Sequence, residues 1–374
     1  MQYSPLDQVQ QRVKAGQALP FNIFDHDRTL LLARGQRVET HEQLQALFSR
    51  GALVDLGELR SPADTVRLAP AKELPQLWNR CLGDLANTLR HASHDGFVAT
   101  METTTPAVMA LVERDKDLAI FQVLRQSASA HAQYGVNHSI HTAITAFLVA
   151  QRLGWSEEEA QRAFKTGLTM NVSMLELQGQ LAEQTTPLTD AQRDQVRAHP
   201  DLSRMMLEMS GVSDPLWLQA VSQHHEHSDG SGYPTGLRES SDTAALVRLA
   251  DIYCAKLSPR AGRDAVAADL AGRQMFMQDP GHPMTAGLVK EFGIYPPGCM
   301  VRLASGESGM VVKRGGAVNS PIVAVLVSAN GVALLLPVRR DSAQAPYAIQ
   351  RVLGGKDLVI KLAPERLMAM VSAA

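Results

Sequence analysis

Histidine is concentrated in one part of this sequence of 374 residues. Seven of the twelve histidines lie between His131 and His227. In this stretch and just beyond it, metal-ligating side chains lie on or beside segments of helical periodicity: His138, His199, His224, His225 and Asp251. Imidazole nitrogens and carboxylate oxygens are ligands for zinc, iron and manganese, and a helical bundle can gather them from several helices. The residue types therefore indicate a candidate metal site.

These histidines also have a simpler explanation. A single histidine on a half-apolar helix is more often a surface residue or a hydrogen-bonded core residue than a ligand, and this is our interpretation of His131 and His141 taken one at a time. Adjacent His224 and His225 would point about 100° apart on a helix. They cannot face one point squarely, although they could reach neighbouring metal positions. The residue types alone leave both explanations open.

The residues from His224 to Pro234 favour the metal site. Their sequence, HHEHSDGSGYP, resembles the HHExxDGxGYP signature of the HD-GYP family at every fixed position. Gly230 and Gly232 permit backbone conformations that other residues avoid, and Pro234 fixes the exit from the turn. The resemblance extends over residues 131–292 and includes four further matches: Asn137-His138-Ser139, Arg197-Ala-His199-Pro200, Leu249-Ala-Asp251-Ile-Tyr253 and Ser258-Pro-Arg260-Ala-Gly-Arg263.

The resemblance implies an activity and a set of metal ligands. Members of this family are all-α HD-type bundles that hydrolyse cyclic di-GMP with two or three metal ions, and paired metals stabilise the attacking and leaving oxygens together. By family role, one metal position keeps His199, His224 and His225. A second metal position keeps only His138 and Asp251.

The resemblance also implies roles for two loops. Arg260, Arg263 and Tyr233 would bind the ligand, and two guanidinium groups can grip phosphates bidentately. Gly232, Tyr233 and Pro234 would form a partner-binding loop. An ordinary solvated helix start is an equally good explanation of the two arginines. Tyr233 could contact a partner, contact a ligand or simply pack the loop.

The His-Asp pair that gives the family half its name is missing. By position, the family's HDIGK segment falls on residues 168–174, where Met170 replaces the histidine, Asn171 the aspartate and Met174 the lysine. A neutral amide is a poor bridge between two cations, and a thioether suits hard divalent ions badly. Tyr134 stands where some members carry an additional glutamate ligand. We therefore assign no catalytic residue here and predict one divalent transition metal, iron, manganese or zinc, or none.

Three functional hypotheses follow. The first is an HD-GYP-like cyclic di-GMP signalling protein with a degenerate metal centre, which acts as a binding or regulatory module with weak or no phosphodiesterase activity. The second is an active metal-dependent phosphodiesterase with an atypical mononuclear centre, and the third is a purely structural protein-interaction module. The implied partners are cyclic di-GMP or a related nucleotide and a signalling protein at the Gly-Tyr-Pro loop, and a homodimer is left open.

The elements that must position these residues predict a mainly α fold. Capping boxes start helices at Thr40, Ser156 and Thr189. We expect a small α/β N-terminal domain at 1–68, a helical connector at 69–130 and a central HD-type helical bundle at 131–292. After Tyr295 the periodicity changes to that of short strands, which predicts a small domain resembling a β-barrel at 293–374.

Composition and charge indicate which partners and which cellular compartment to expect. The net charge of −2 gives no support for a DNA or membrane-surface partner. The sequence has no apolar run near the roughly 18 residues that a membrane-spanning helix needs. The three scattered cysteines, Cys81, Cys254 and Cys299, are typical of free thiols in a reducing compartment. We therefore expect a cytoplasmic protein.

Overall fold

The structure is a computed structural model that describes residues 2–125, 133–354 and 363–372. The chain divides into two compact units, residues 1–68 and residues 69–374. His131 lies outside the described residues. Among the helices that are described, none combines the length and the apolar character that crossing a membrane requires.

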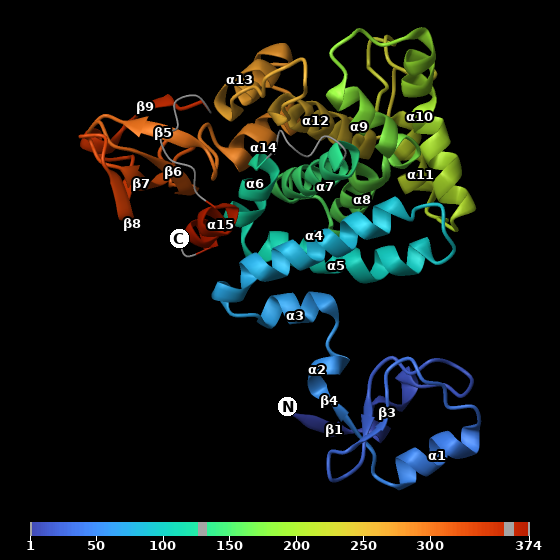
Figure 1. The fold of residues 1–374 in the computed structure, drawn as a ribbon. Coiled ribbons are helices and arrows are strands. Elements are labelled where there is room, and N and C mark those ends of the chain that lie inside the picture. The colour runs from blue at the N-terminus through green and yellow to red at the C-terminus, as the bar shows by residue number, and fades with distance from the viewer. Residues whose placement is uncertain (1, 126–132, 355–362, 373–374) are drawn as a thin grey trace. The chain divides into compact units, whose positions relative to one another are not determined.

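The first unit is a small α/β structure (Figure 1). Its antiparallel sheet has the strand order β1-β4-β2-β3. Phe21, Ile23 and Val54 are fully buried and belong to its core. The predicted capping box at Thr40 is confirmed, since its side chain accepts from the Gln43 amide. The elements are β1 (Tyr3–Pro5), β2 (Ile23–Phe24), β3 (Leu30–Leu32), β4 (Leu53–Asp55), α1 (His41–Ser49), α2 (Leu56–Leu59) and α3 (Pro62–Leu68).

The second unit is mostly helical, as predicted. It begins with α4 (Leu74–Arg90), α5 (Phe97–Arg114) and α6 (Lys116–Leu124), and α4 and α5 pack against each other. The following helices are α7 (Tyr134–Arg152), α8 (Glu157–Thr169), α9 (Leu175–Glu183), α10 (Asp190–Met209), α11 (Pro215–Gln223), α12 (Asp242–Leu257), α13 (Ala268–Gln278) and α14 (Pro283–Phe292). The predicted capping boxes at Ser156 and Thr189 start α8 and α10.

Helix α7 is the centre of the bundle and carries His138. Nearly every side chain from Tyr134 to Ala150 is buried, and α7 packs against α8, α12, α9, α14, α6 and α4. Its contact with α8 is closest at Gly167, where a Cβ would lie 3.0 Å from backbone atoms of Ala143. The bundle is therefore built around a helix that has almost no solvent-exposed face.

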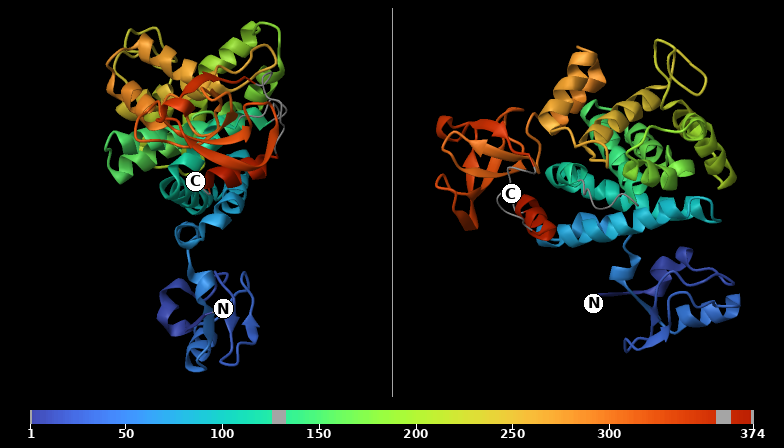
Figure 2. Two further views of the ribbon diagram at one scale, coloured as in Figure 1. Left: turned by 90° about the vertical axis from the view of Figure 1, so that its left-hand side faces the viewer. Right: turned by 45° about the horizontal axis from the view of Figure 1, so that its top comes forward.

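A five-stranded antiparallel sheet lies at one end of the bundle (Figures 1 and 2). Its order is β8-β7-β6-β5-β9, so β8 and β9 form its edges. The predicted barrel is not confirmed, because no ladder joins β8 to β9 in the part of the chain that is described. The strands are β5 (Met300–Leu303), β6 (Ser308–Lys313), β7 (Ile322–Val327), β8 (Ala333–Asp341) and β9 (Ile349–Val352).

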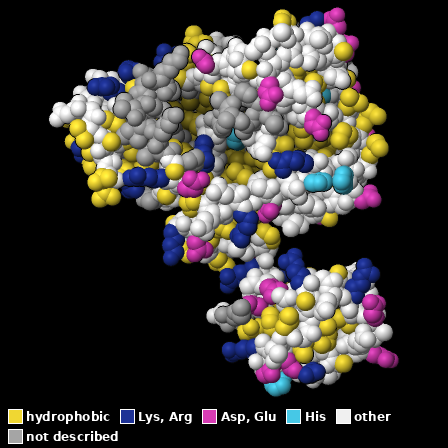
Figure 3. Space-filling model, in the orientation of Figure 1, with side chains coloured by type: hydrophobic (Ala, Val, Ile, Leu, Met, Phe, Trp, Pro, Cys, Tyr) yellow, Lys and Arg dark blue, Asp and Glu magenta, His cyan; other side chains and the backbone are white. Residues whose placement is uncertain are grey.

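A last helix, α15 (Pro364–Ser372), returns to the bundle and packs against α6 and α4. The sequence pattern did not predict this helix. The bundle and the sheet belong to one compact unit, so domain boundaries at 130 and 292 stay a prediction. On the face shown in Figure 3, basic and acidic side chains are interspersed rather than gathered by sign.

Candidate metal centre

Three of the predicted ligands lie together. His199 comes from α10, His224 directly follows α11, and His225 is the next residue. Each offers one ligand atom, and these atoms all lie within 4.8 Å of one another. The Nε2 atoms of His199 and His224 are 3.1 Å apart. We call these three residues the histidine cluster.

Hydrogen bonds to the backbone set the tautomers of two of these rings. Nδ1 of His199 lies 2.5 Å from the Val196 carbonyl oxygen, and Nδ1 of His224 lies 2.6 Å from the Val221 carbonyl oxygen. Because a carbonyl can only accept, each Nδ1 must carry the proton. Each Nε2 therefore presents a lone pair. This is the arrangement that fixes histidine ligands around metals.

The donor set fits a metal ion. Two lone pairs 3.1 Å apart, with no proton between them, repel one another unless a cation lies against both. When two imidazoles bind one ion, each ligating nitrogen lies about 2.1 Å from it. The two nitrogens are then roughly 3.0 Å apart at the octahedral angle and roughly 3.4 Å apart at the tetrahedral angle. The observed separation of His199 and His224 fits this range. The role of the histidine cluster as a ligand set nevertheless stays a prediction.

The histidine cluster is kept neutral by its surroundings. Burial, helped by the neighbouring His224, lowers the pKa of His199 to about 3. Burial likewise lowers the pKa of His224 and of His225. Neutral imidazole is the form that binds metals. All three side chains are therefore in the ligating state at neutral pH.

Tyr233 packs on the histidine cluster rather than pointing into solvent. Its ring stacks on His225, with centroids 4.6 Å apart and planes inclined by 24°. The guanidinium carbon of Arg197 lies 5.8 Å from the centre of the same ring. Burial raises the pKa of the Tyr233 hydroxyl, so the phenol stays neutral. These contacts are those of the packing role, one of the three roles that the sequence left open.

Glu226, to which the sequence analysis gave no role, organises the same loop. Its carboxylate is 1% exposed and accepts hydrogen bonds from the amide and hydroxyl of Thr235, both at 2.8 Å, and from the amide of Leu237 at 2.9 Å. Gly232 is required because a Cβ there would lie 2.5 Å from the His227 nitrogen. The signal that could have revealed Glu226 is its fixed position in the HHExxDGxGYP pattern.

The other two predicted ligands contact each other. Nε2 of His138 lies 2.6 Å from Oδ1 of Asp251, and Nδ1 of His138 is buried without a partner among the described residues. Burial raises the pKa of Asp251, but the hydrogen bond and charge of His138 outweigh it and hold that pKa below its usual range. The Asp251 charge also acts on His199, His224 and His225. The pair and the histidine cluster therefore adjoin one another.

The two predicted phosphate-binding arginines make internal contacts. The Arg260 guanidinium donates to the Tyr134 hydroxyl at 2.7 and 3.2 Å and lies 4.9 Å from the centre of that ring. Tyr134 in turn stacks on His138, with centroids 5.5 Å apart. Arg263 is exposed and donates to the Ala255 carbonyl at the end of α12. Phosphate binding by these arginines stays a prediction.

Part of the second unit is similar to a known protein family. Residues 122–275 match the sequence model of the HD domain family. They include all five predicted metal ligands, and the HHExxDGxGYP pattern lies within them. Residues 122–275 are therefore similar to HD domains, and the pattern within them supports the resemblance to the HD-GYP family.

Curated relatives are named as cyclic dinucleotide phosphodiesterases. The chain is 31% identical over 204 residues to the cyclic di-GMP phosphodiesterase PA4108 of Pseudomonas aeruginosa, covering 53% of this chain and 49% of that protein. It is 23% identical over 198 residues to the 3'3'-cGAMP-specific phosphodiesterase 1 of Vibrio cholerae, covering 49% of this chain and 46% of that protein. It is 30% identical over 137 residues to the cyclic di-GMP phosphodiesterase response regulator RpfG of Xanthomonas campestris, covering 35% of each.

The chain spans about half the length of the first two of these relatives and about a third of the other. Among solved structures, the chain is similar to Bd1817, a HDG"Y"P protein from Bdellovibrio bacteriovorus. The TM-score is 0.47 at 16% sequence identity, covering 77% of this chain and 97% of that one.

The segment expected to carry the HD-GYP His-Asp pair lies beside the histidine cluster. Met170, Asn171 and Met174 are all buried. Between them, the Ser173 hydroxyl donates to the His199 carbonyl oxygen at 3.1 Å and lies 2.9 Å from the Ser203 hydroxyl. The segment is therefore fixed against α10 where His199 projects.

Asn171 is the most informative residue of this segment. Its amide oxygen is buried and has no hydrogen-bond partner in the part of the chain that is described. An unpaired buried polar atom costs about 1 to 3 kcal/mol. By the family resemblance, the Asn171 amide is expected where other members have the bridging carboxylate. Its oxygen accepts no hydrogen bond from the described residues.

Proposed function

We propose that this chain is a cyclic di-GMP signalling protein that acts by binding, with weak or no phosphodiesterase activity. Its HD centre would hold one divalent transition metal on His199, His224 and His225. The observation that carries this proposal is the uneven distribution of donors around the centre. One side has three convergent neutral imidazoles. The other side has His138 and Asp251, which hydrogen-bond to each other.

The proposed loss of hydrolysis follows from the missing bridge. In a two-metal site, a shared ligand holds the ions so that attacking and leaving oxygens are stabilised together. Asn171 offers only a neutral amide at the expected position, and Met170 a soft thioether. When bound, a single ion would supply Lewis acidity at one position. The remaining residues would orient a ligand rather than complete an in-line displacement.

The proposed ligand is a cyclic dinucleotide, because the curated relatives carry names of that activity. Candidate contacts are Arg260 and Arg263 for phosphate and Tyr233 for a base or the loop. A signalling partner at Gly232, Tyr233 and Pro234, a homodimer and a cytoplasmic location remain parts of the proposal. The cysteines, all buried and free, are compatible with that location.

Metal content and turnover test the proposal together. Elemental analysis of the purified chain should find no more than one transition-metal ion per chain, and His224→Ala should lose it. Calorimetry should detect binding of cyclic di-GMP, while added manganese or iron should produce no turnover. Two ions per chain would contradict the mononuclear centre.

The remaining outcomes separate the alternatives. Turnover that His224→Ala abolishes would establish an active phosphodiesterase with an atypical centre. Neither binding nor turnover would favour a structural interaction module. Arg273→Gln is a suitable control, because Arg273 is an exposed cation on α13 and should change neither metal content nor binding.

A further inference from the structure

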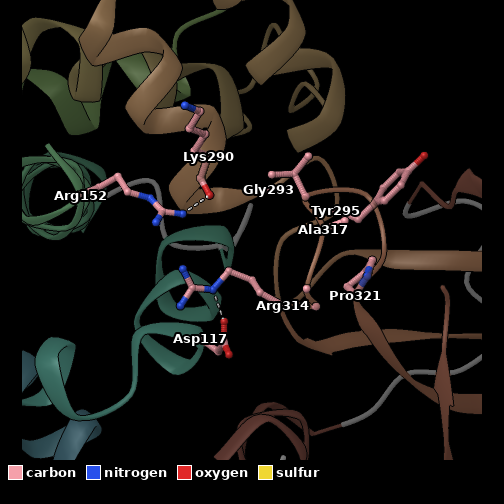
Figure 4. Close-up of a pocket in the computed structure, with 11 residues that line it drawn as sticks. Asp117, Arg152, Lys290, Gly293, Tyr295, Arg314, Ala317 and Pro321 are labelled. Carbon is pink, nitrogen blue, oxygen red and sulfur yellow. Dashed lines mark hydrogen bonds and ion pairs between the residues drawn. The ribbon is translucent and has the colours of Figure 1, made fainter.

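A cavity of about 310 Å³ lies away from the histidine cluster, where the helical bundle meets the C-terminal sheet (Figure 4). Its walls come from the start of α6, the end of α7, the end of α14 and the turn between β6 and β7. The size is at the lower end of the range for small-molecule sites. The chemistry described above does not use it.

Positive charge predominates on the cavity wall. The lining includes Arg152, Lys290 and Arg314 but only one carboxylate, Asp117. A second carboxylate, Glu291, is 2% exposed and contacts both guanidinium groups, Arg152 at 3.0 Å and Arg314 at 2.7 Å. The two guanidinium groups balance the two carboxylates, and Lys290 adds one positive charge to the lining.

The guanidinium groups are held in place but retain unused donors. Arg152 uses Nε toward Glu291 and Nη2 toward the Lys290 carbonyl oxygen. Arg314 uses Nε toward Asp117 and Nη1 toward Glu291. Nη1 of Arg152 and Nη2 of Arg314 have no partner among the residues described. In Figure 4 the two side chains extend toward one another from different elements, and the Lys290 ammonium extends away from them.

The turn from Arg314 to Pro321 forms the remaining wall with exposed backbone. Gly315 can only be glycine, because a Cβ would lie 1.7 Å from the Ser320 carbonyl oxygen. The amide groups of Gly315, Gly316 and Ala317 donate to no acceptor within the described ranges. Unpaired amides on successive residues of a turn suit an anion. The residues that line the cavity therefore carry donors on a helix side chain, on a turn side chain and on the turn backbone.

We propose that this cavity is a binding site for a small ligand that bears a phosphate group. Guanidinium groups bind oxyanions through charge-assisted hydrogen bonds. The donors here belong to several elements around the cavity, which suits the tetrahedral oxygens of a phosphate better than the two coplanar oxygens of a carboxylate. A ligand in this position would contact α7 and the β6–β7 turn together. It would thereby join the C-terminal sheet to the helix that carries His138.

Anion-dependent stability of the full-length chain tests the proposal. Inorganic phosphate and pyrophosphate should raise the melting temperature relative to chloride at equal ionic strength, because a ligand that binds the folded state stabilises it. Calorimetry should give a dissociation constant for pyrophosphate. Stabilisation by malonate but by neither phosphate nor pyrophosphate would overturn the choice of phosphate, and no anion effect would overturn the site.

Pyrophosphate binding by the variant Gly316→Asp tests whether the anion lies in this cavity. A Cβ at Gly316 meets nothing within 4 Å, so the variant adds a negative charge to the wall without a backbone clash. We expect its dissociation constant for pyrophosphate to rise about tenfold. Gly83→Asp is the matched control, because exposed Gly83 on α4 also has open space around its Cβ position. Equal loss in both variants would contradict the location.

Three further variants test the proposed site against other positions. Lys290→Gln should weaken binding by a smaller factor, whereas Lys72→Gln, at an exposed lysine elsewhere in the unit, should not. His224→Ala should leave pyrophosphate binding intact. Binding that survives Gly316→Asp but disappears in His224→Ala would place the anion at the histidine cluster and overturn the proposal.

Discussion

At the scale of single residues, the candidate centre depends on which atoms carry lone pairs. Carbonyl partners fix the protons of His199 and His224 on Nδ1 and leave two Nε2 lone pairs 3.1 Å apart. Asn171, in the neighbouring segment, presents an unpaired oxygen without charge. Under the proposal, the imidazoles bind one cation, and the segment of residues 168–174 offers no charged side chain to bridge it to a second.

Restoring the family residues should restore the second ion. We expect Met170→His with Asn171→Asp and Met174→Lys to raise the metal content by about one ion per chain, because a carboxylate can bridge two cations and an amide cannot. Elemental analysis after incubation with manganese or iron measures the change. Met170→Leu with Asn171→Leu is the control, since it alters packing without adding a ligand. Unchanged metal content in the restored variant would show that residues other than these three prevent a second ion from binding.

Residue types and the HHExxDGxGYP pattern were sufficient to identify the histidine cluster, because ligands of a metal must be of few kinds. They could not identify the groups that orient these histidines. The Val196 and Val221 carbonyl oxygens act through the backbone, which leaves no trace in residue type. The placement of Arg260 on Tyr134 depends on two segments that are far apart in the sequence.

At the scale of elements, local signals predicted helix starts well. The capping boxes at Thr40, Ser156 and Thr189 form as expected, because all their hydrogen bonds lie within four residues. Closure of the C-terminal sheet could not be predicted in this way. It requires a pairing between strands at opposite ends of the sheet, and strand periodicity does not specify such a pairing.

Two helix glycines should respond to alanine with opposite signs. Gly83→Ala on α4 should raise stability by up to about 1 kcal/mol, because alanine favours helix and the added methyl group meets nothing. Gly167→Ala on α8 should lower stability by about 1 to 2 kcal/mol, because its Cβ would lie 3.0 Å from the Ala143 backbone and overpacking outweighs the helix preference. Urea denaturation followed by circular dichroism measures both. Stabilisation by Gly167→Ala would mean that α7 and α8 can separate at low cost.

At the scale of the whole molecule, charge links the helical bundle to the C-terminal sheet within residues 69–374. Arg314, in the turn after β6, bonds to Asp117 on α6 and to Glu291 on α14, and Glu291 also bonds to Arg152 on α7. Burial lowers the pKa of Arg314, but the two carboxylates outweigh it and raise that pKa. No single segment of the sequence predicts this network, because its four members come from four elements.

Removing the shared carboxylate tests how much this network contributes. Glu291 is 2% exposed, and replacing it by glutamine leaves two guanidinium groups without their common counter-charge. We expect Glu291→Gln to lower stability by about 2 to 3 kcal/mol, less than for a fully buried pair because both arginines are partly exposed. Glu158→Gln is the control: its carboxylate is 83% exposed and pairs with Arg162, so the urea midpoint should barely move. Equal midpoints for the two variants would mean that apolar packing alone holds the sheet to the helices.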